Sequence, residues 1–170
     1  MPEQETLRRA RQDKSAGKAP STQAGEFVRE EMHHVRRGKH GARSSKQAIA
    51  IGLSKARRAG VALPPPRRGK KKTRESAARA YAQGQSGRTR RPSGRRSRAI
   101  SRALKREGRQ AASPRSLARQ ARSSARTRTA GQRSGAARRA AATKGRAGRS
   151  AAARKAARTR LRHSRSRSSR

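Results

Sequence analysis

The sequence predicts an all-α protein: a small N-terminal helical hairpin of two to three helices, followed by a largely disordered basic tail with nascent helices. Three observations lead to this prediction. Only 16 of the 170 residues are Val, Ile, Leu, Met, Phe or Tyr, because 33 of the hydrophobic residues are Ala. The 50 Lys and Arg far outnumber the 8 Asp and Glu, and the net charge is +42. High charge with few large apolar side chains is typical of disorder, and most of the apolar side chains lie near the N-terminus.

Charge and apolar residues divide the chain at the triple proline, residues 64–66. Residues 1–66 hold 14 basic and 6 acidic residues and 11 of the large apolar side chains. Residues 67–170 hold 36 basic and 2 acidic residues and only five large apolar side chains. A proline run favours extended backbone and ends a preceding helix. The expected domains are a helical head over 1–63, a Pro-rich basic linker over 64–74 and a disordered tail over 75–170.

Residues 21–38 read as an amphipathic helix, and residues 3–14 could add a short helix before it. Ser21 suits the N-cap position and Gly38 the left-handed position after the last turn. Glu31 falls on the apolar side of the helix, so we expect it to pair with a cation of a neighbouring element. The residues that share this side at helical spacing are Ala24, Phe27, Val28, Met32 and Val35.

Residues 44–60 read as a second amphipathic helix of the head. Ser44 or Ser45 is its expected cap, and Gly60 followed by Val61 predicts a Schellman-type end. Gly52 lies on the packed face and would let another helix approach closely. Two helices with about ten anchoring side chains are marginal as an independent fold. We therefore expect the head to need residues 3–14, a second copy of itself or a bound polyanion.

The tail consists mainly of Arg, Ala, Ser, Gly and Thr, with 30 Arg and six Lys after residue 66. Segments such as SRALKREG at 101–108 and SLARQARSSAR at 116–126 have high helix propensity and are separated by Gly, Ser and Pro. Repulsion between arginines should keep these helices sparsely populated in the free protein. Neutralisation by phosphate would remove the repulsion, so folding on binding is expected.

Several classes of protein are excluded by composition. The chain has no Cys, hence no disulfide and no thiolate zinc site. No apolar run approaches the roughly 20 residues that span a bilayer, and the polar N-terminus is not a signal peptide. Glu30, His33 and His34 offer an E-x-x-H spacing, which we interpret as a polar helix face. The prediction is an intracellular, cytoplasmic protein that is no enzyme, with no catalytic residue, metal or cofactor.

Binding to a polyanion is the function that the charge favours. Duplex DNA carries one charge per roughly 1.7 Å, and each neutralised phosphate releases condensed counterions. The guanidinium of Arg can form two hydrogen bonds with one phosphate, and the side chain can enter a narrow minor groove. Tyr81 is the only aromatic residue after residue 66, which weighs against recognition of single strands by stacking.

The predicted phosphate contacts are cations of the linker and tail, with three cations of the head as a second set. The linker and tail residues are Arg67, Arg68, Lys70, Lys71, Lys72, Arg90, Arg91, Arg95, Arg96, Arg98, Lys105, Arg106, Arg138, Arg139, Arg154, Lys155, Arg158 and Arg160. The head residues are Lys39, Arg43 and Lys46.

One stretch carries a resemblance to a known family. GKHGARSSKQAIAIGLSKARRAG, at residues 38–60 and followed by the proline run, resembles small basic bacterial proteins with a KQAIAIALSEARKAG-like core, classed as a domain of unknown function. SRALKRE, SLARQAR and RSAAARKAARTR in the tail resemble segments of longer members. The tail also resembles bacterial linker-histone-like proteins, although those favour Lys where this chain has Arg. The resemblance implies a bacterial source and adds no mechanism.

The leading functional hypothesis is a nucleoid-associated, histone-like protein that binds duplex DNA without base specificity and compacts it. The head would form a homodimer or fix the geometry of the tail. The alternative is an RNA-binding or ribosome-associated basic protein. A third hypothesis, a polybasic membrane-surface protein, is disfavoured because the tail lacks the apolar face that enters lipid, so no membrane partner is expected.

Overall fold

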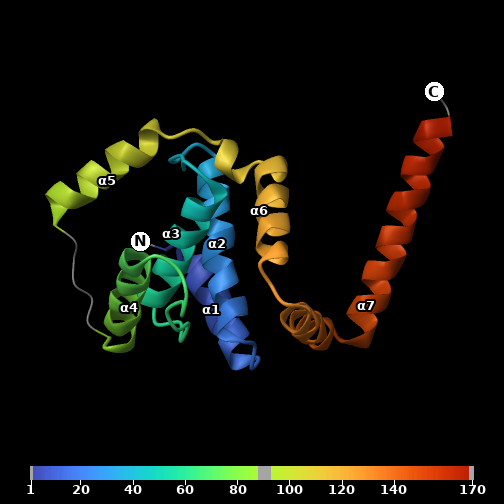
Figure 1. Cartoon of the computed structure of the whole chain (residues 1–170), viewed down its shortest axis with the longest axis horizontal. Coiled ribbons are helices and arrows are strands. Elements are labelled where there is room, and N and C mark those ends of the chain that lie inside the picture. Colours follow the sequence, from blue (N-terminus) through green and yellow to red (C-terminus); the bar gives the residue numbers. More distant parts are fainter. Residues whose placement is uncertain (1, 88–92, 169–170) are drawn as a thin grey trace. The chain divides into compact units, whose positions relative to one another are not determined.

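The computed structural model describes residues 2–87 and 93–168, with side chains up to residue 161. Within these residues there are helices and no strand (Figure 1). Two compact units are present, residues 1–122 and 123–170. The elements are α1 (Gln4–Ser15), α2 (Pro20–Arg36), α3 (Ser45–Arg58), α4 (Lys71–Gln85), α5 (Gly94–Arg106), the 3-10 turn η1 (Gln110–Ala112), α6 (Pro114–Arg126) and α7 (Ala130–Ser168).

The predicted fold class, a small helical hairpin with a disordered tail, is wrong. In the part of the chain that the structure describes, four helices follow the proline run, and α7 alone extends over 39 residues. The prediction rested on the scarcity of large apolar side chains. Ala and Arg are strong helix formers, and Ala and Gly let helices approach closely enough to pack without large side chains.

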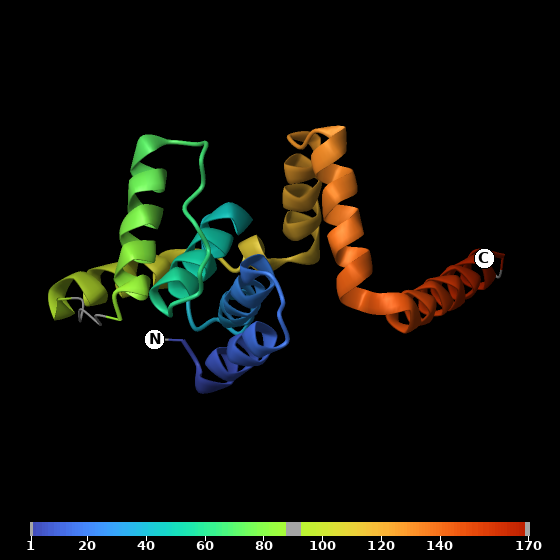
Figure 2. The same ribbon diagram turned by 90° about the horizontal axis from the view of Figure 1, so that it is seen from below.

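The α2–α3 pair is the centre of the first unit, with α1 packed on α2 and α4 packed on α3 (Figures 1 and 2). Phe27 and Val35 of α2 are fully buried, as the predicted apolar face requires. At Gly52 of α3, a Cβ would lie 2.7 Å from the Cα of Val28. The expected close approach at Gly52 is therefore confirmed, and α2 is the helix that approaches.

Two apolar clusters hold the first unit together. One lies between α1, α2 and α3 and comprises Ala10, Ala24, Phe27, Ala56 and Val61, with Leu7, Leu53 and Leu63 packed against it. The second lies at the other end of α2 and comprises Met32, Val35, Ala42, Ala48, Ala111 and Ala112, with Val28, Ile49 and Leu117 packed against it. Both clusters are rich in Ala. Because one cluster lies at each end of α2, this helix contacts its neighbours along its whole length.

The helix ends follow from local sequence. Ser44 caps α3 by accepting a hydrogen bond from the Gln47 amide at 3.2 Å. Gly60 has φ of 89°, and the Val61 amide donates to the Ala56 carbonyl at 3.1 Å, which confirms the Schellman end. Ser21 as the cap of α2 is wrong: the cap is Ala19 and Pro20 is the first helical residue. Proline suits that position because its φ is already helical.

The first unit extends beyond residue 63, where the sequence predicts the head to end. The guanidinium of Arg57 donates to the carbonyls of Leu63 at 3.1 Å and Pro64 at 3.3 Å, which ties the proline run to α3. Burial lowers the pKa of Arg57 below its ordinary value. Beyond the prolines, Ala77 and Ala80 of α4 are buried, so residues assigned to the tail contribute to the core.

The contact between α4 and α3 is closest at Gly84. A Cβ on Gly84 would overlap the carbonyl oxygen of Arg57, so we expect Gly84→Ala to push α4 away and to destabilise the unit by about 1–3 kcal/mol. Gly25 is the matched control, since it is also helical but has nothing within 4 Å. Gly25→Ala should be stabilising, by up to about 1 kcal/mol. Urea unfolding followed by circular dichroism measures both, and equal effects would contradict the close packing at Gly84.

Residues 104–112 close the far end of the first unit. The amide of Gly41 donates to the Leu104 carbonyl at 2.8 Å, and the amide of Ala42 donates to the Gly108 carbonyl at 3.1 Å. The Ser45 hydroxyl donates to the Ala111 carbonyl at 2.6 Å. Ala111 and Ala112 are buried in the second cluster, so this segment completes the core that α2 and α3 begin.

The second unit contains α7, which is interrupted at Gly145 (Figure 2). Gly145 has φ of 64° and ψ of 179°, a backbone conformation that is essentially restricted to glycine. Two helical arms result, residues 130–144 and 146–168. The Arg and Lys side chains of residues 130–161 are exposed.

Candidate functional site

The predicted phosphate contacts that the structure describes are all exposed. Arg90 and Arg91 lie outside the described residues. Arg67, Arg68 and Lys70 precede α4, and Lys71 and Lys72 form its first turn. The α5 residues are Arg95, Arg96, Arg98, Lys105 and Arg106, and the α7 residues are Arg138, Arg139, Arg154, Lys155, Arg158 and Arg160.

Helix α5 places three of its arginines opposite its apolar residues. Arg95, Arg98 and Arg102 follow one another at spacings of three and four, so they lie on one face of the helix. Ile100 and Leu104 lie on the other side, and Ile100 is 54% exposed. Arg102 was not among the predicted contacts, although its spacing from Arg98 was a usable signal.

Helix α6 carries a second arginine stripe that the prediction also missed. Arg115, Arg119 and Arg122 are spaced by four and three residues, which places them in one line about 10 Å long. Leu117 is on the opposite side and packs against the second cluster. The helix is therefore held to the first unit by Leu117 while all three arginines remain exposed.

Folding brings cations that are distant in the sequence to one hollow of the first unit. Arg37, at the end of α2, lines this hollow together with Lys105 and Arg109, which lie near the end of α5. Glu107, Gly108 and the loop residues Gly38, His40 and Gly41 complete the lining. Of the predicted contacts, Lys105 is the one found here, and its proximity to Arg37 could not be read from the sequence.

The acidic residues of the first 66 positions are all engaged in ion pairs. The pairs join Glu3 to Lys39 at 2.7 Å, Glu5 to Arg8 at 2.7 Å, Asp13 to Lys18 at 2.6 Å, Glu26 to Arg29 at 3.0 Å, Glu30 to Lys55 at 3.5 Å and Glu31 to Lys55 at 2.7 Å. Of the predicted head contacts, Lys39 is thus paired with Glu3, while Arg43 and Lys46 are exposed around the start of α3. These carboxylates offer little repulsion to an approaching anion.

Two of these carboxyl groups have strongly lowered pKa values. Hydrogen bonds from Lys39 and from His34 lower the pKa of Glu3 from 4.5 to about 2. Hydrogen bonds from Arg8 and Arg9 lower the pKa of Glu5 from 4.5 to about 2. Both carboxylates therefore stay ionised in the folded protein at pH values where they would be half protonated in the unfolded chain.

We expect the Glu3 pairs to give the protein a stability that depends on pH. The folded pKa lies below the unfolded one, so the stabilisation is complete above pH 4.5 and is lost as the pH falls toward about 2. Glu3→Gln should lower the thermal unfolding midpoint at pH 6 and have a much smaller effect near pH 2. Gln4→Ala, an exposed change at the adjacent position, serves as control. An equal effect of Glu3→Gln at both pH values would contradict the ionic origin.

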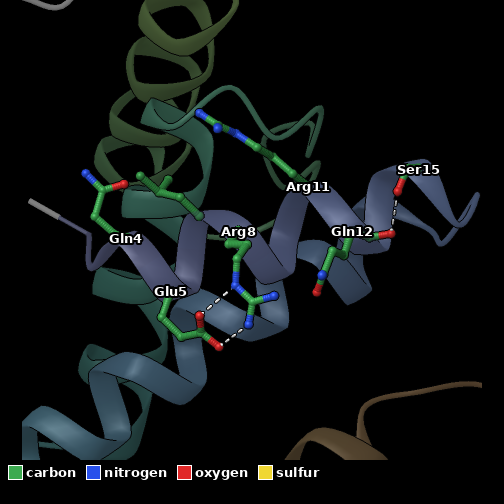
Figure 3. Close-up of a pocket in the computed structure, with 7 residues that line it drawn as sticks. Gln4, Glu5, Arg8, Arg11, Gln12 and Ser15 are labelled. Atoms are coloured by element: carbon green, nitrogen blue, oxygen red, sulfur yellow. Dashed lines mark hydrogen bonds and ion pairs between the residues drawn. The ribbon is translucent and has the colours of Figure 1, made fainter.

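A hollow along α1 is shown in Figure 3. All the residues that line it belong to α1. Its polar groups are used locally: Arg8 donates to Glu5 at 2.8 and 2.7 Å, and the Ser15 hydroxyl donates to the Gln12 carbonyl at 3.0 Å. No second element supplies a lining group, so this hollow does not assemble a catalytic set.

A buried polar cluster lies where α2 meets α3 and the 37–44 loop. Glu31 is fully buried, with Lys55 Nζ 2.7 Å from its Oε2 and His40 Nε2 3.0 Å from its Oε1. The expectation that Glu31 pairs with a cation of another element is confirmed. The E-x-x-H spacing of Glu30 and His33 is not assembled, because Glu30 is buried and His33 is exposed. The buried histidine is His34.

The chain is thus an all-helical protein whose second half presents exposed cations along its helices. Residues 11–71 match the model of a family of unknown function (DUF6496). The match contains α2, α3 and the last five residues of α1, and it includes the stretch that carries the resemblance to an uncharacterised family. No curated protein and no solved structure matches this chain. Within the described residues, no helix combines the length and apolar character that crossing a membrane requires.

Proposed function

We propose that this protein binds duplex DNA without base specificity, by neutralising phosphates along the backbone. The observation that carries the proposal is the charge of α7. Residues 130–168 contain 13 Lys and Arg and no Asp or Glu, and the cations of residues 130–161 are exposed. A helix so densely charged is stabilised by a polyanion, because bound phosphates remove the repulsion between its cations.

The form of α7 suits a duplex. The major groove admits an α-helix, and the arms of 15 and 23 residues are about 22 and 35 Å long. The cations are distributed around the helix, so phosphates on both sides of a groove could be contacted. The glycine between the arms lets each arm take its own direction along the DNA.

The first unit adds three groups of cations to this interaction: the arginine faces of α5 and α6 and the hollow that contains Arg37, Lys105 and Arg109. The first turns of α4 and α5 hold Lys71, Lys72, Arg95 and Arg96 and no acidic residue. Cations are unfavourable at the positive end of a helix dipole, whereas phosphate is favourable there. A bound phosphate would satisfy both the cations and the free backbone amides.

Membrane and single-strand binding are weaker alternatives. Leu161 is the only large apolar residue in residues 130–161, whereas a helix that lies on a membrane needs an apolar face. Tyr81 is the only aromatic side chain after residue 66, which gives single strands no stacking platform. A histone-like role in the bacterial nucleoid is part of the proposal, in line with the resemblance of the tail to linker-histone-like proteins.

The test is a salt titration of binding by the full chain to a random duplex of about 40 base pairs, followed by competition with structured RNA of equal phosphate number. If about 20–30 phosphates are engaged, affinity should fall steeply with salt: log K should drop by about 0.9 for each phosphate when log salt rises by one unit. Absence of binding at about 100 mM salt, or binding that persists at about 1 M, contradicts the proposal. Preference for RNA in the competition would establish the alternative function instead.

A further inference from the structure

The buried cluster of α2 and the 37–44 loop has a geometry that ion pairing alone does not explain. Glu31, His34 and His40 each offer one ligand atom, and these three atoms all lie within 4.8 Å of one another. Glu31 and His34 are buried and His40 is partly buried. Glu31 is fully enclosed, and an isolated charge in such a place is costly unless it is paired and hydrogen-bonded.

Glu31 has charged neighbours but no good hydrogen bond. Among the described residues, no donor reaches either carboxylate oxygen with hydrogen-bond geometry, although Lys55 Nζ and His40 Nε2 lie 2.7 and 3.0 Å away. The short distances are real ion-pair contacts, but their directions are wrong for a hydrogen bond. Neighbouring ligands of a metal ion show this same relation, because they lie about 3.3 Å apart and point at the ion rather than at each other.

The ring of His40 is held in the orientation that metal binding requires. Its Nδ1 lies 3.0 Å from the Gly41 carbonyl oxygen, which can only accept a hydrogen bond, so Nδ1 carries the hydrogen. In the neutral ring this leaves the lone pair on Nε2, the atom nearest Glu31. A backbone carbonyl on the other ring nitrogen is the usual support for a ligating histidine.

His34 is supported by two carboxylates. Its Nε2 lies 2.9 Å from Glu3 Oε1 and 3.8 Å from Glu30 Oε1. Carboxylates beside a ligating histidine fix its ring and raise its basicity. The two histidine rings meet edge to face, with centroids 5.9 Å apart, and each offers a ring nitrogen within 4.8 Å of the other ligand atoms.

We propose that Glu31, His34 and His40 form a binding site for a divalent transition-metal ion, with Zn²⁺ as the expected ion. Two imidazoles and one carboxylate are a ligand set that zinc accepts, with a fourth position for water or a further carboxylate. The ligands lie outside the arginine faces of α5 and α6, but His40 also lines the hollow that contains Arg37, Lys105 and Arg109. Its ligands come from α2 and the following loop, so a bound ion would fasten that loop to the helix.

The groups in ion-pair contact around Glu31 and His34 carry a small negative surplus. Glu3, Glu30 and Glu31 bring three negative charges, and Lys39 and Lys55 bring two positive ones. One negative charge is left over among these five groups, while Glu107 and the cations Arg37, Lys105 and Arg109 line a hollow together with His40. A divalent ion between Glu31 and His40 would neutralise this excess negative charge, while Lys55 keeps its contact with Glu30.

The experiment titrates Zn²⁺ into the full chain without a histidine tag, by calorimetry, and repeats the titration on His40→Gln and His33→Gln. His33 is the matched control, because it lies beside His34 on α2 but is exposed. We expect one ion per chain for wild type and His33→Gln, and an affinity at least about tenfold lower for His40→Gln. Zinc should also raise the thermal unfolding midpoint of wild type and His33→Gln but not of His40→Gln.

A second measurement keeps the test independent of how well the variant folds. Co²⁺ bound to wild type should give the intense visible absorption of a tetrahedral site, and X-ray absorption of the zinc-loaded protein should show two imidazole ligands. Failure of wild type to bind zinc overturns the proposal. Equal loss of affinity in His33→Gln and His40→Gln overturns it too, since the ion would then be held by surface histidines.

Discussion

Replacement of eight cations of α7 by Gln will make DNA binding much less sensitive to salt. The positions are Arg138, Arg139, Arg146, Arg149, Arg154, Lys155, Arg158 and Arg160. If each contacts one phosphate, the slope of log K against log salt becomes shallower by about 7, at roughly 0.9 per contact. Gln is nearly as good a helix former as Arg and Lys, so α7 keeps its helical propensity. Fluorescence anisotropy with a labelled duplex at several salt concentrations measures the slope.

The control for charge is Lys at the seven Arg positions of this set. That variant keeps all the cations but loses the bidentate grip of guanidinium. It should keep the salt slope of the wild type and bind somewhat more weakly. A Gln variant with the slope of the wild type would place the phosphate contacts elsewhere in the chain, and the α5 and α6 arginine faces would be the next positions to change.

Phe27→Ala is expected to have the largest effect on stability. Phe27 is fully buried in the cluster shared by α1, α2 and α3, and the other buried residues there are Ala and Val, which cannot expand into the space. Loss of a buried Phe costs about 3–5 kcal/mol, a large part of the 5–15 kcal/mol that typically stabilises a domain. Urea unfolding followed by circular dichroism measures the loss.

Val28→Ala is the matched control on the same helix. Val28 is only partly buried and touches the other cluster, so the substitution removes fewer contacts. It should cost clearly less than Phe27→Ala. Similar losses for the two variants would mean that the cluster around Phe27 does not hold the first unit together.

The helices of the head could be predicted because they carry local signals. Apolar spacing identified the buried side of α2, and Ser44, Gly60 and Val61 marked the two ends of α3. The partner of Glu31 could be inferred as a cation, but not as Lys55, because the crossing of α2 and α3 depends on Gly52. Local patterns determine where a helix lies and which side is buried, whereas its partners depend on the path of the whole chain.

Packing after residue 66 could not be predicted because it uses Ala and Gly. Ala77, Ala80 and Gly84 of α4 resemble the rest of the Ala-rich tail in sequence, yet they fit against α3. Ala111 and Ala112 are likewise buried without any large neighbour to mark them. A count of large apolar residues therefore underestimates how much of this chain can pack.

In the candidate site too, some features could be predicted from local sequence and others depend on the path of the whole chain. Cations could be identified from composition, and the predicted ones of α5 and α7 are exposed, whereas their contact with phosphate stays a prediction. Arg119 was missed although the spacing of the arginines around it is regular, because the segment was treated as disordered. The cluster of Glu31, His34 and His40 depends on how the 37–44 loop folds back, and no local pattern places His40 beside Glu31.

The burial of Ala111 and Ala112 has a consequence for the order of events during synthesis. Chains emerge from the ribosome N-terminus first, and α1, α2 and α3 are complete by residue 58. The end of α2 around Met32 and Val35 is then covered only by Ala42, Ala48 and Ile49 until Ala111 and Ala112 emerge, more than 50 residues later. A nascent chain that stops at the proline run would expose this apolar surface, so the first unit reaches its final state only when much of the basic region is already outside the ribosome.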